Sequence, residues 1–144
     1  PSLLETRAVV NGQWIETGDT FPVHNPSSGE KIADVTYLAI SDVSQAIDGA
    51  YDAKIAWGMK TGKERGAILR KWYDLMVENV DDLASILTAE MGKPLAEAKG
   101  EIMYGASYIE WFAEEAKRIY GDVIPGHQPD KRIVVLKQPV GVVG

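Results

Sequence analysis

The chain of 144 residues has no cysteine. A stretch without thiols carries no disulfide, no thiolate zinc site and no cysteine nucleophile of its own. Histidine is scarce too, because His24 and His127 are the only two, and both lie in turn-like sequence beside proline or glycine. Neither histidine has an acidic neighbour at the spacing of a metal site or a proton relay. We therefore expect structural or exposed roles for both and predict no metal site.

Long apolar runs and clusters of positive charge are also missing. No run approaches the ~20 residues that span a bilayer, and the first residues do not resemble a signal peptide. We therefore expect no membrane contact and a cytoplasmic location. The net charge of −6, from 15 basic and 21 acidic residues, argues against a nucleic-acid surface, which needs clustered lysine and arginine. The composition is typical of a globular segment with one modest core.

The first part of the chain is predicted to be extended. Asn-Gly at 11–12, between strand-forming residues, is a strong signal for a two-residue hairpin turn that sets Val9 opposite Trp14. A second extended pair is predicted at 20–23 and 31–35, around a turn rich in asparagine, proline, serine and glycine. The chain therefore opens with β-hairpins.

Apolar residues then recur at helical spacing. The first predicted helix is capped by Ser41 or Asp42 and ends at Gly58. Thr61 and Glu64 match a capping box that starts a second helix, in which the threonine hydroxyl and the glutamate carboxylate each accept a backbone N–H.

Two further helices are predicted. A short one carries Leu83, Ile86 and Leu87 and ends near Gly92. The longest runs from about Leu95 to Tyr120, followed by Gly121 as a left-handed C-terminal residue.

The last part of the chain is predicted to be extended again. Residues 122–126 are predicted to be a loop, and Arg132 to Lys137 to be a strand without a partner, whose edge must be covered in an assembly. The apolar run 139–144 is typical of a buried strand that enters a glycine turn. In open α/β sheets the chemistry lies beyond the carboxyl ends of such strands, so we expect this chain to be part of a larger enzyme.

Two glycine-containing segments are poor candidates for phosphate binding. Residues 58–64 are one residue too short between the glycines for a P-loop and end in glutamate, so we interpret them as a turn between helices. Residues 141–144 lack the first glycine pair and the receiving helix of a dinucleotide fingerprint.

The long predicted helix holds the remaining candidates. Glu97 and Glu101 share a face, but Lys93 precedes Glu97 by four, and a solvated charged face is the favoured interpretation. Gly100 and Tyr104 also share a face, and a glycine beside an aromatic leaves room for a ligand or for a closely packed helix. From the residues alone, helix packing is favoured.

Motifs along the whole chain resemble one known family. They are Asn-Gly-x-Trp at 11–14, Asn-Pro-Ser-Ser-Gly at 25–29, the segment 57–69, Glu-Met-Gly-Lys-Pro-Leu-Ala-Glu-Ala at 90–98, the segment 104–113, Gly-Asp-Val-Ile-Pro at 121–125 and Gln-Pro-Val-Gly-Val at 138–142. In this order they resemble the N-terminal region of the aldehyde dehydrogenase superfamily. The segments 99–102 and 109–121 look most like NADP-dependent succinate semialdehyde dehydrogenases.

The resemblance implies a fold and a domain division. The expected fold class is α/β, with β-hairpins and amphipathic helices flanking a Rossmann-like cofactor domain and with an oligomerisation strand. Residues 1–120 would be the N-terminal part of the cofactor-binding domain, 121–140 an oligomerisation arm, and 141–144 the start of a Rossmann-like strand. A homodimer or homotetramer would form through the arm.

The resemblance also implies a chemistry. The family oxidises a small aldehyde by attack of a cysteine thiolate, hydride transfer to NADP or NAD, and hydrolysis by water that a glutamate activates. Those groups would lie beyond Gly144, so we expect no catalytic or cofactor-binding residue here and no activity of the segment alone. Gly100 and Tyr104 would line the substrate tunnel. The alternative is a complete, non-catalytic helical binding or assembly module that uses its exposed strand to add a partner.

Overall fold

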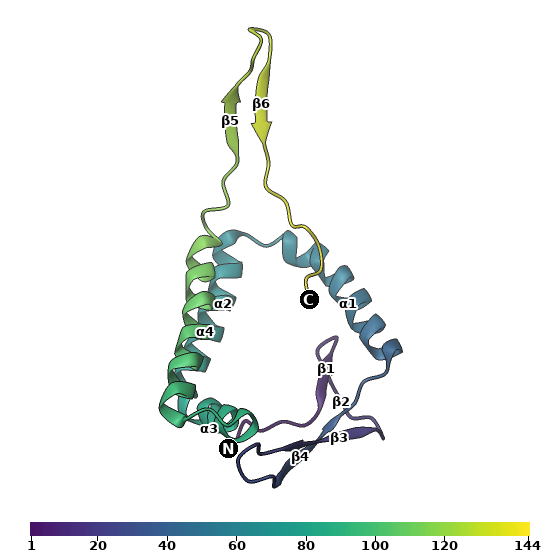
Figure 1. Ribbon diagram of the computed structural model, residues 1–144. Helices are drawn as coiled ribbons and strands as arrows, with labels where there is room; N and C mark the ends of the chain where they lie inside the picture. Colours follow the sequence, from purple (N-terminus) through teal and green to yellow (C-terminus); the bar gives the residue numbers. More distant parts are fainter.

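Six strands and four helices follow one another in the computed structural model, which describes residues 1–144. In chain order they are β1 (Ala8–Val10), β2 (Gln13–Ile15), β3 (Thr20–His24), β4 (Lys31–Thr36), α1 (Ile40–Gly58), α2 (Gly62–Glu78), α3 (Val80–Met91), α4 (Leu95–Glu115), β5 (Asp122–Pro125) and β6 (Arg132–Val135). The elements form an open ring from which the β5–β6 hairpin projects (Figure 1). This arrangement matches the predicted α/β class with its β-hairpins and amphipathic helices.

Both predicted N-terminal hairpins are confirmed. β1 pairs with β2 in antiparallel register, with Val9 opposite Trp14. Asn11 and Gly12 both have positive φ, at 53° and 75°, as the two-residue turn of type I′ requires. The Asn11 side chain lies over Gly49 of α1, so the turn residue also positions the hairpin on the helix. β3 and β4 form the second antiparallel pair.

The start of α1 differs from the prediction, whereas the start of α2 confirms it. Ala39 is the N-terminal cap of α1, and the Asp42 carboxylate accepts its backbone N–H at 2.9 Å. Ser41 or Asp42 as the cap was wrong, because Ala39 is the last extended residue and Asp42 falls three positions inside. At α2, the Thr61 N–H donates to Glu64 Oε2 at 2.7 Å and the Glu64 N–H donates to Thr61 Oγ1 at 3.3 Å.

Two of three predicted helix ends are confirmed. α1 ends at Gly58 and α3 ends before Gly92, which is left-handed at φ 82°, and both ends were predicted. α4, in contrast, ends at Glu115 rather than at Tyr120, and Gly121 is not among the residues of positive φ. The reason for glycine there is space, because a Cβ on Gly121 would overlap the Val135 carbonyl oxygen.

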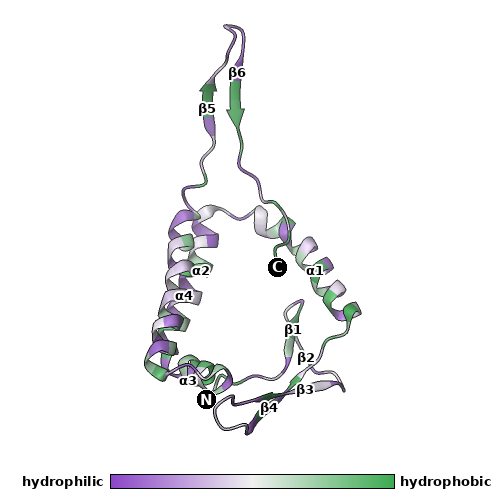
Figure 2. Cartoon of the chain, viewed as in Figure 1, coloured by the Kyte–Doolittle hydropathy of each residue, from purple (hydrophilic) through white to green (hydrophobic).

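The β5–β6 hairpin corrects two predictions. Residues 122–126 are not a loop, because β5 occupies most of them, and the strand after Arg132 is not without a partner, because it pairs with β5. Val123 lies opposite Val134, and these two side chains are 76% and 63% exposed. Ile124 and Ile133, on the other face, are also exposed, and Figure 2 shows the apolar character of β6. A two-stranded hairpin with apolar residues on both faces is at best marginal in water.

Helices α2, α3 and α4 pack along a seam of small residues. The buried residues of this seam are Gly66, Ala84, Ala98, Ala106 and Ala113. Small side chains let helix backbones approach closely. At Gly66 an added Cβ would lie 2.6 Å from the Ala113 carbonyl oxygen. No large side chain is fully buried anywhere in the chain.

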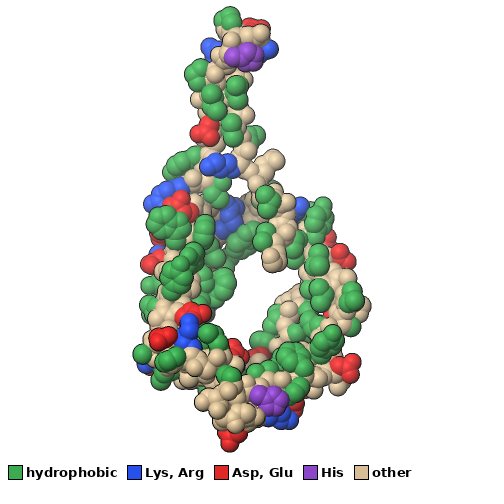
Figure 3. All heavy atoms as spheres, viewed as in Figure 1, with side chains coloured by type: hydrophobic (Ala, Val, Ile, Leu, Met, Phe, Trp, Pro, Cys, Tyr) green, Lys and Arg blue, Asp and Glu red, His purple; other side chains and the backbone are tan.

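The chain exposes far more surface than its size requires. A compact protein of 15.7 kDa exposes roughly 7,300 Å², whereas this chain exposes 10,696 Å². The excess of roughly 3,400 Å² on one chain is several times the roughly 800 Å² that each partner buries in a standard interface. The space-filling view shows that side chains do not close the centre of the ring (Figure 3). The elements therefore surround a space that their own side chains do not fill.

The segment 139–144 forms no strand, contrary to the prediction. It returns beside α1 (Figure 1), and Val140 is 95% exposed. A buried strand needs neighbouring strands to pair its N–H and C=O groups, and no other strand of this chain pairs with the segment.

Candidate functional site

The two glutamates that share a face of α4 differ in their partners. Lys93 pairs with Glu101 rather than with Glu97, and Glu97 has no ion-pair partner. Lys99 lies 2.6 Å from the Asp81 carboxylate and so ties α4 to α3. The interpretation of this face as a solvated charged surface is confirmed.

Gly100 does not serve helix packing. A Cβ built on Gly100 meets no atom within 4 Å, so the glycine faces open space. None of the other helices of this chain packs against Gly100, contrary to the favoured interpretation. Tyr104, one turn further on, is also exposed, at 63%. The helix thus presents a glycine and a tyrosine side by side on an uncovered face.

An aromatic groove continues from Tyr104 along α4. Tyr108, Trp111 and Phe112 follow at helical spacing, and each is at least half exposed. The four aromatic residues line one open groove together with side chains from the end of α4 and from α2. Gly100 lies outside the residues that line this groove. The groove offers apolar surface with polar groups at its rim, as small-molecule sites commonly do.

Two tyrosine hydroxyls meet in this groove. The Tyr104 and Tyr108 oxygens are 2.5 Å apart, and the rings pack edge to face with centroids 5.0 Å apart. The hydrogen bond with Tyr104 raises the pKa of Tyr108. The Tyr108 phenol is therefore neutral near pH 7.

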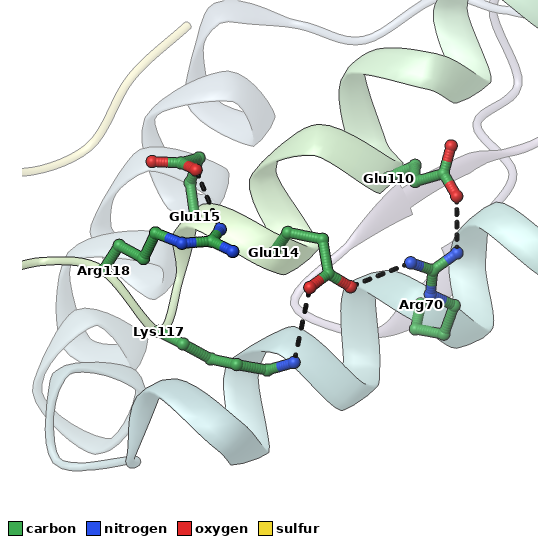
Figure 4. Close-up of polar contacts among 6 residues, drawn as sticks. All are labelled: Arg70, Glu110, Glu114, Glu115, Lys117 and Arg118. Atoms are coloured by element: carbon green, nitrogen blue, oxygen red, sulfur yellow. Dashed lines mark hydrogen bonds and ion pairs between the residues drawn. The ribbon is translucent and has the colours of Figure 1, made fainter.

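The charged rim is built around Arg70. Figure 4 shows its guanidinium, carried by α2, between two carboxylates of α4. Arg70 donates to Glu110 at 2.8 Å and to Glu114 at 3.0 Å. Lys117 also lies 3.6 Å from Glu114, and Glu115 pairs separately with Arg118. The acidic residues at the rim are thus each paired with a cation.

These ion pairs shift the pKa values of Glu114 and Arg70. The hydrogen bond from Arg70 is the main cause that lowers the pKa of Glu114, and the bond to Glu110 is the main cause that raises the pKa of Arg70. A carboxyl group whose pKa is lowered in the folded state stabilises the fold at pH values above its unfolded pKa of about 4.3. That contribution to stability is lost as the pH falls through the lower pKa of the folded state. Because the side chains are partly exposed, the network orients groups more than it stabilises the fold.

Other motifs do not form a site. His24 and His127 are both exposed, which agrees with the structural or exposed roles predicted for them. Residues 58–64 lie at the junction between α1 and α2, as predicted, and no group of acidic or histidine side chains is placed to hold a metal ion. No helix has both the length and the apolar character to cross a membrane.

Sequence reasoning missed two features of the groove. Arg70 and Glu114 are 44 residues apart, and no local pattern indicates their contact. The spacing of four between Tyr104 and Tyr108 was available as a signal, because such residues lie one above the other on a helix.

The comparisons with known proteins agree on one family. The model of the aldehyde dehydrogenase family matches residues 14–144. Among curated proteins, a glutarate-semialdehyde dehydrogenase of Pseudomonas putida is 57% identical over 97% of this chain and 30% of its own length. An NADP-dependent succinate-semialdehyde dehydrogenase of Escherichia coli is 54% identical over 98% of this chain and 30% of its own length.

A solved structure supports the same assignment. The crystal structure of a succinate-semialdehyde dehydrogenase from Burkholderia pseudomallei matches with a TM-score of 0.93 and 52% identity, over 98% of this chain and 30% of that one. The chain belongs to the aldehyde dehydrogenase family. It spans about 30% of the length of the curated relatives described above, and its fold is that of the N-terminal part of these enzymes.

Proposed function

We propose that this chain is the N-terminal part of an NADP- or NAD-dependent dehydrogenase that oxidises a small semialdehyde to the carboxylic acid. The observation that carries the proposal is the identity above 50% to enzymes named for succinate and glutarate semialdehyde, over nearly the whole chain. Those two aldehydes both end in a carboxylate and differ by one methylene. The substrate class is therefore a short aldehyde with an anionic end.

The exposed surface supports a role within a larger protein. The excess of exposed area and the open ring fit a scaffold that surrounds further protein (Figure 3). A cysteine nucleophile must come from outside this chain, because the chain has none. The activating glutamate and most nicotinamide contacts would come from outside as well. The segment alone is therefore expected to be inactive, and the whole enzyme to act in the cytoplasm.

Within this proposal the parts of the chain have separate roles. Residues 1–120 belong to the cofactor-binding domain, 121–140 form an arm that joins subunits into a homodimer or homotetramer, and 141–144 lead into the Rossmann-like sheet. The exposed apolar faces of β5 and β6 support the role of the arm. Gly100 and Tyr104 line the aldehyde tunnel, and the open space over Gly100 supports that role.

The function is tested with the full-length protein and with residues 1–144 alone. Both are incubated with succinate semialdehyde, glutarate semialdehyde or butanal, and with NADP+ or NAD+, while reduced nicotinamide is followed by absorbance. We expect the full-length protein to oxidise the two semialdehydes in preference to butanal, and the segment to oxidise nothing. Equal rates with butanal would remove the semialdehyde assignment, and activity of the segment alone would place the reactive groups in it.

The tunnel role of Gly100 makes a second prediction. Gly100→Phe in the full-length protein is expected to lower kcat/KM for the semialdehyde roughly tenfold or more, because a ring in the tunnel displaces the substrate from its reactive position. The thermal midpoint should change little, since a side chain there meets no atom of this chain.

Gly18→Phe is the matched control for Gly100→Phe. Gly18 also faces open space but lies in the loop between β2 and β3, so its replacement should leave kcat/KM unchanged. Wild-type kinetics of Gly100→Phe would show that the tunnel runs elsewhere.

A further inference from the structure

The hydroxyl pair on α4 is a polar feature within an aromatic groove. Tyr104 and Tyr108 lie one helical turn apart, and their oxygens are 2.5 Å apart. The edge-to-face contact of the rings, with an interplanar angle of 83°, fixes the mutual orientation of the phenols. Trp111 and Phe112 continue the groove with apolar surface. The pair therefore places hydroxyl groups at one end of an apolar path.

One of the two phenolic protons is free. Two hydroxyls that share one hydrogen bond use one proton between them and leave the other available to a further acceptor. Either hydroxyl can donate in this bond, and neither makes another hydrogen bond within the chain. When Tyr108 is the donor, the Tyr104 O–H is the free one. That O–H can be donated to a ligand in the groove.

The surrounding charges permit an anionic ligand. Two carboxylates at the rim, Glu110 and Glu114, would repel an anion if they were unpaired. Both are held by Arg70, at 2.8 and 3.0 Å, and Lys117 lies 3.6 Å from Glu114, so the two carboxylates face two cations. The free phenolic O–H is a neutral donor, and its oxygen also accepts a hydrogen bond. Such a donor suits a carboxylate, because hydrogen bonds to charged acceptors are the stronger ones.

We propose that the Tyr104 hydroxyl donates a hydrogen bond to the terminal carboxylate of the semialdehyde, and that Tyr108 is the positioning residue for that hydroxyl. The inference rests on the proposed function and assigns a specificity role within it. Tyr108 acts in two ways: its donated bond fixes the direction of the Tyr104 O–H, and it polarises that O–H into a better donor. Trp111 and Phe112 lie where the methylene chain of the substrate would pass.

The test measures the preference for a carboxylate in the full-length protein. For Tyr104→Phe, Tyr108→Phe and the double variant, kcat/KM is determined with succinate semialdehyde and with butanal, which has the same number of carbons but no carboxylate. Phenylalanine keeps both rings, so packing is preserved. Tyr120→Phe is the matched control, since Tyr120 is 67% exposed and its hydroxyl makes no hydrogen bond within the chain.

The expected result is a graded and non-additive loss of selectivity. Tyr104→Phe should lower the ratio of kcat/KM for semialdehyde over butanal about tenfold, through KM, since one hydrogen bond to a charge is lost. Tyr108→Phe should lower the ratio about two- to threefold. The double variant should resemble Tyr104→Phe, because Tyr108 acts only through Tyr104. Tyr120→Phe should retain the wild-type ratio.

Three outcomes would overturn the inference. An unchanged ratio in Tyr104→Phe excludes contact with the carboxylate while the dehydrogenase function stands. A further loss from Tyr108→Phe in the Tyr104→Phe background, or equal losses with both aldehydes, shows that Tyr108 supports structure only. If the full-length protein oxidises neither aldehyde, the proposed function fails and this inference fails with it.

Discussion

Val134→Asp is expected to separate the subunits of the full-length protein. Val134 is 63% exposed on a hairpin that projects from the ring, and we propose that another subunit covers it. A carboxylate buried there without a partner would cost at least about 3 kcal/mol, which raises the dissociation constant of the assembly roughly 100-fold. Sedimentation velocity at low micromolar concentration should show the smaller species. Leu136→Asp, at a position 75% exposed, should act in the same direction.

The control places the same charge on the same hairpin without touching its apolar strands. Gln128→Asp lies in the turn between β5 and β6, where residues 126–131 are outside the paired strands, so its sedimentation should equal that of the parent. An unchanged sedimentation coefficient of Val134→Asp would count against the arm as an interface. Loss of activity without dissociation would instead indicate a local defect.

The arm also shows why part of the fold escaped sequence reasoning. Ile-Pro-Gly at 124–126 has the composition of a turn, and proline is rare within strands. In the structure Pro125 is the last paired residue of β5, opposite Arg132, where the missing N–H does least harm. Strand length was therefore decided by pairing, which the composition of the segment does not reveal.

Local signals predicted the parts of the fold that depend on local chemistry. The Asn-Gly turn at 11–12 and the capping box at Thr61 both require particular residues at fixed spacing, and both were found. The role of Gly121 was not, because it depends on the approach of Gly121 to the Val135 carbonyl. Such an approach joins segments that are adjacent only in space.

Part of the candidate site could likewise be predicted from local sequence, and part could not. The shared face of Gly100 and Tyr104 follows from helical periodicity and could be predicted. The sequence could not show whether that face is packed or open, because the answer depends on where α2 and α3 lie. The contact of Arg70 with Glu110 likewise exists only because α2 and α4 pack side by side. The spacing of the two helices therefore sets the geometry of the groove.

Gly66→Ala is expected to destabilise the fold although alanine favours helices. The change should gain up to about 1 kcal/mol of helix propensity, but the new Cβ would lie 2.6 Å from the Ala113 carbonyl oxygen. Helix backbones that must separate lose packing along the seam, so we expect a net loss of about 1–2 kcal/mol. Arg70, one turn along α2, would also be displaced from Glu110. The measurement is the unfolding midpoint of the full-length protein in denaturant.

Gly105→Ala is the matched control, because it is the same change inside α4 and its Cβ would meet no atom within 4 Å. It should leave the midpoint unchanged or raise it. A higher midpoint for Gly66→Ala would mean that the gain in helix propensity outweighs the steric overlap of the new Cβ. The close approach of α2 and α4 would then be contradicted. A lower midpoint together with slower hydrogen exchange in α4 would also contradict it, since separated helices must exchange faster. The seam of small residues is thus tested at a glycine where α2 approaches the Ala113 carbonyl of α4.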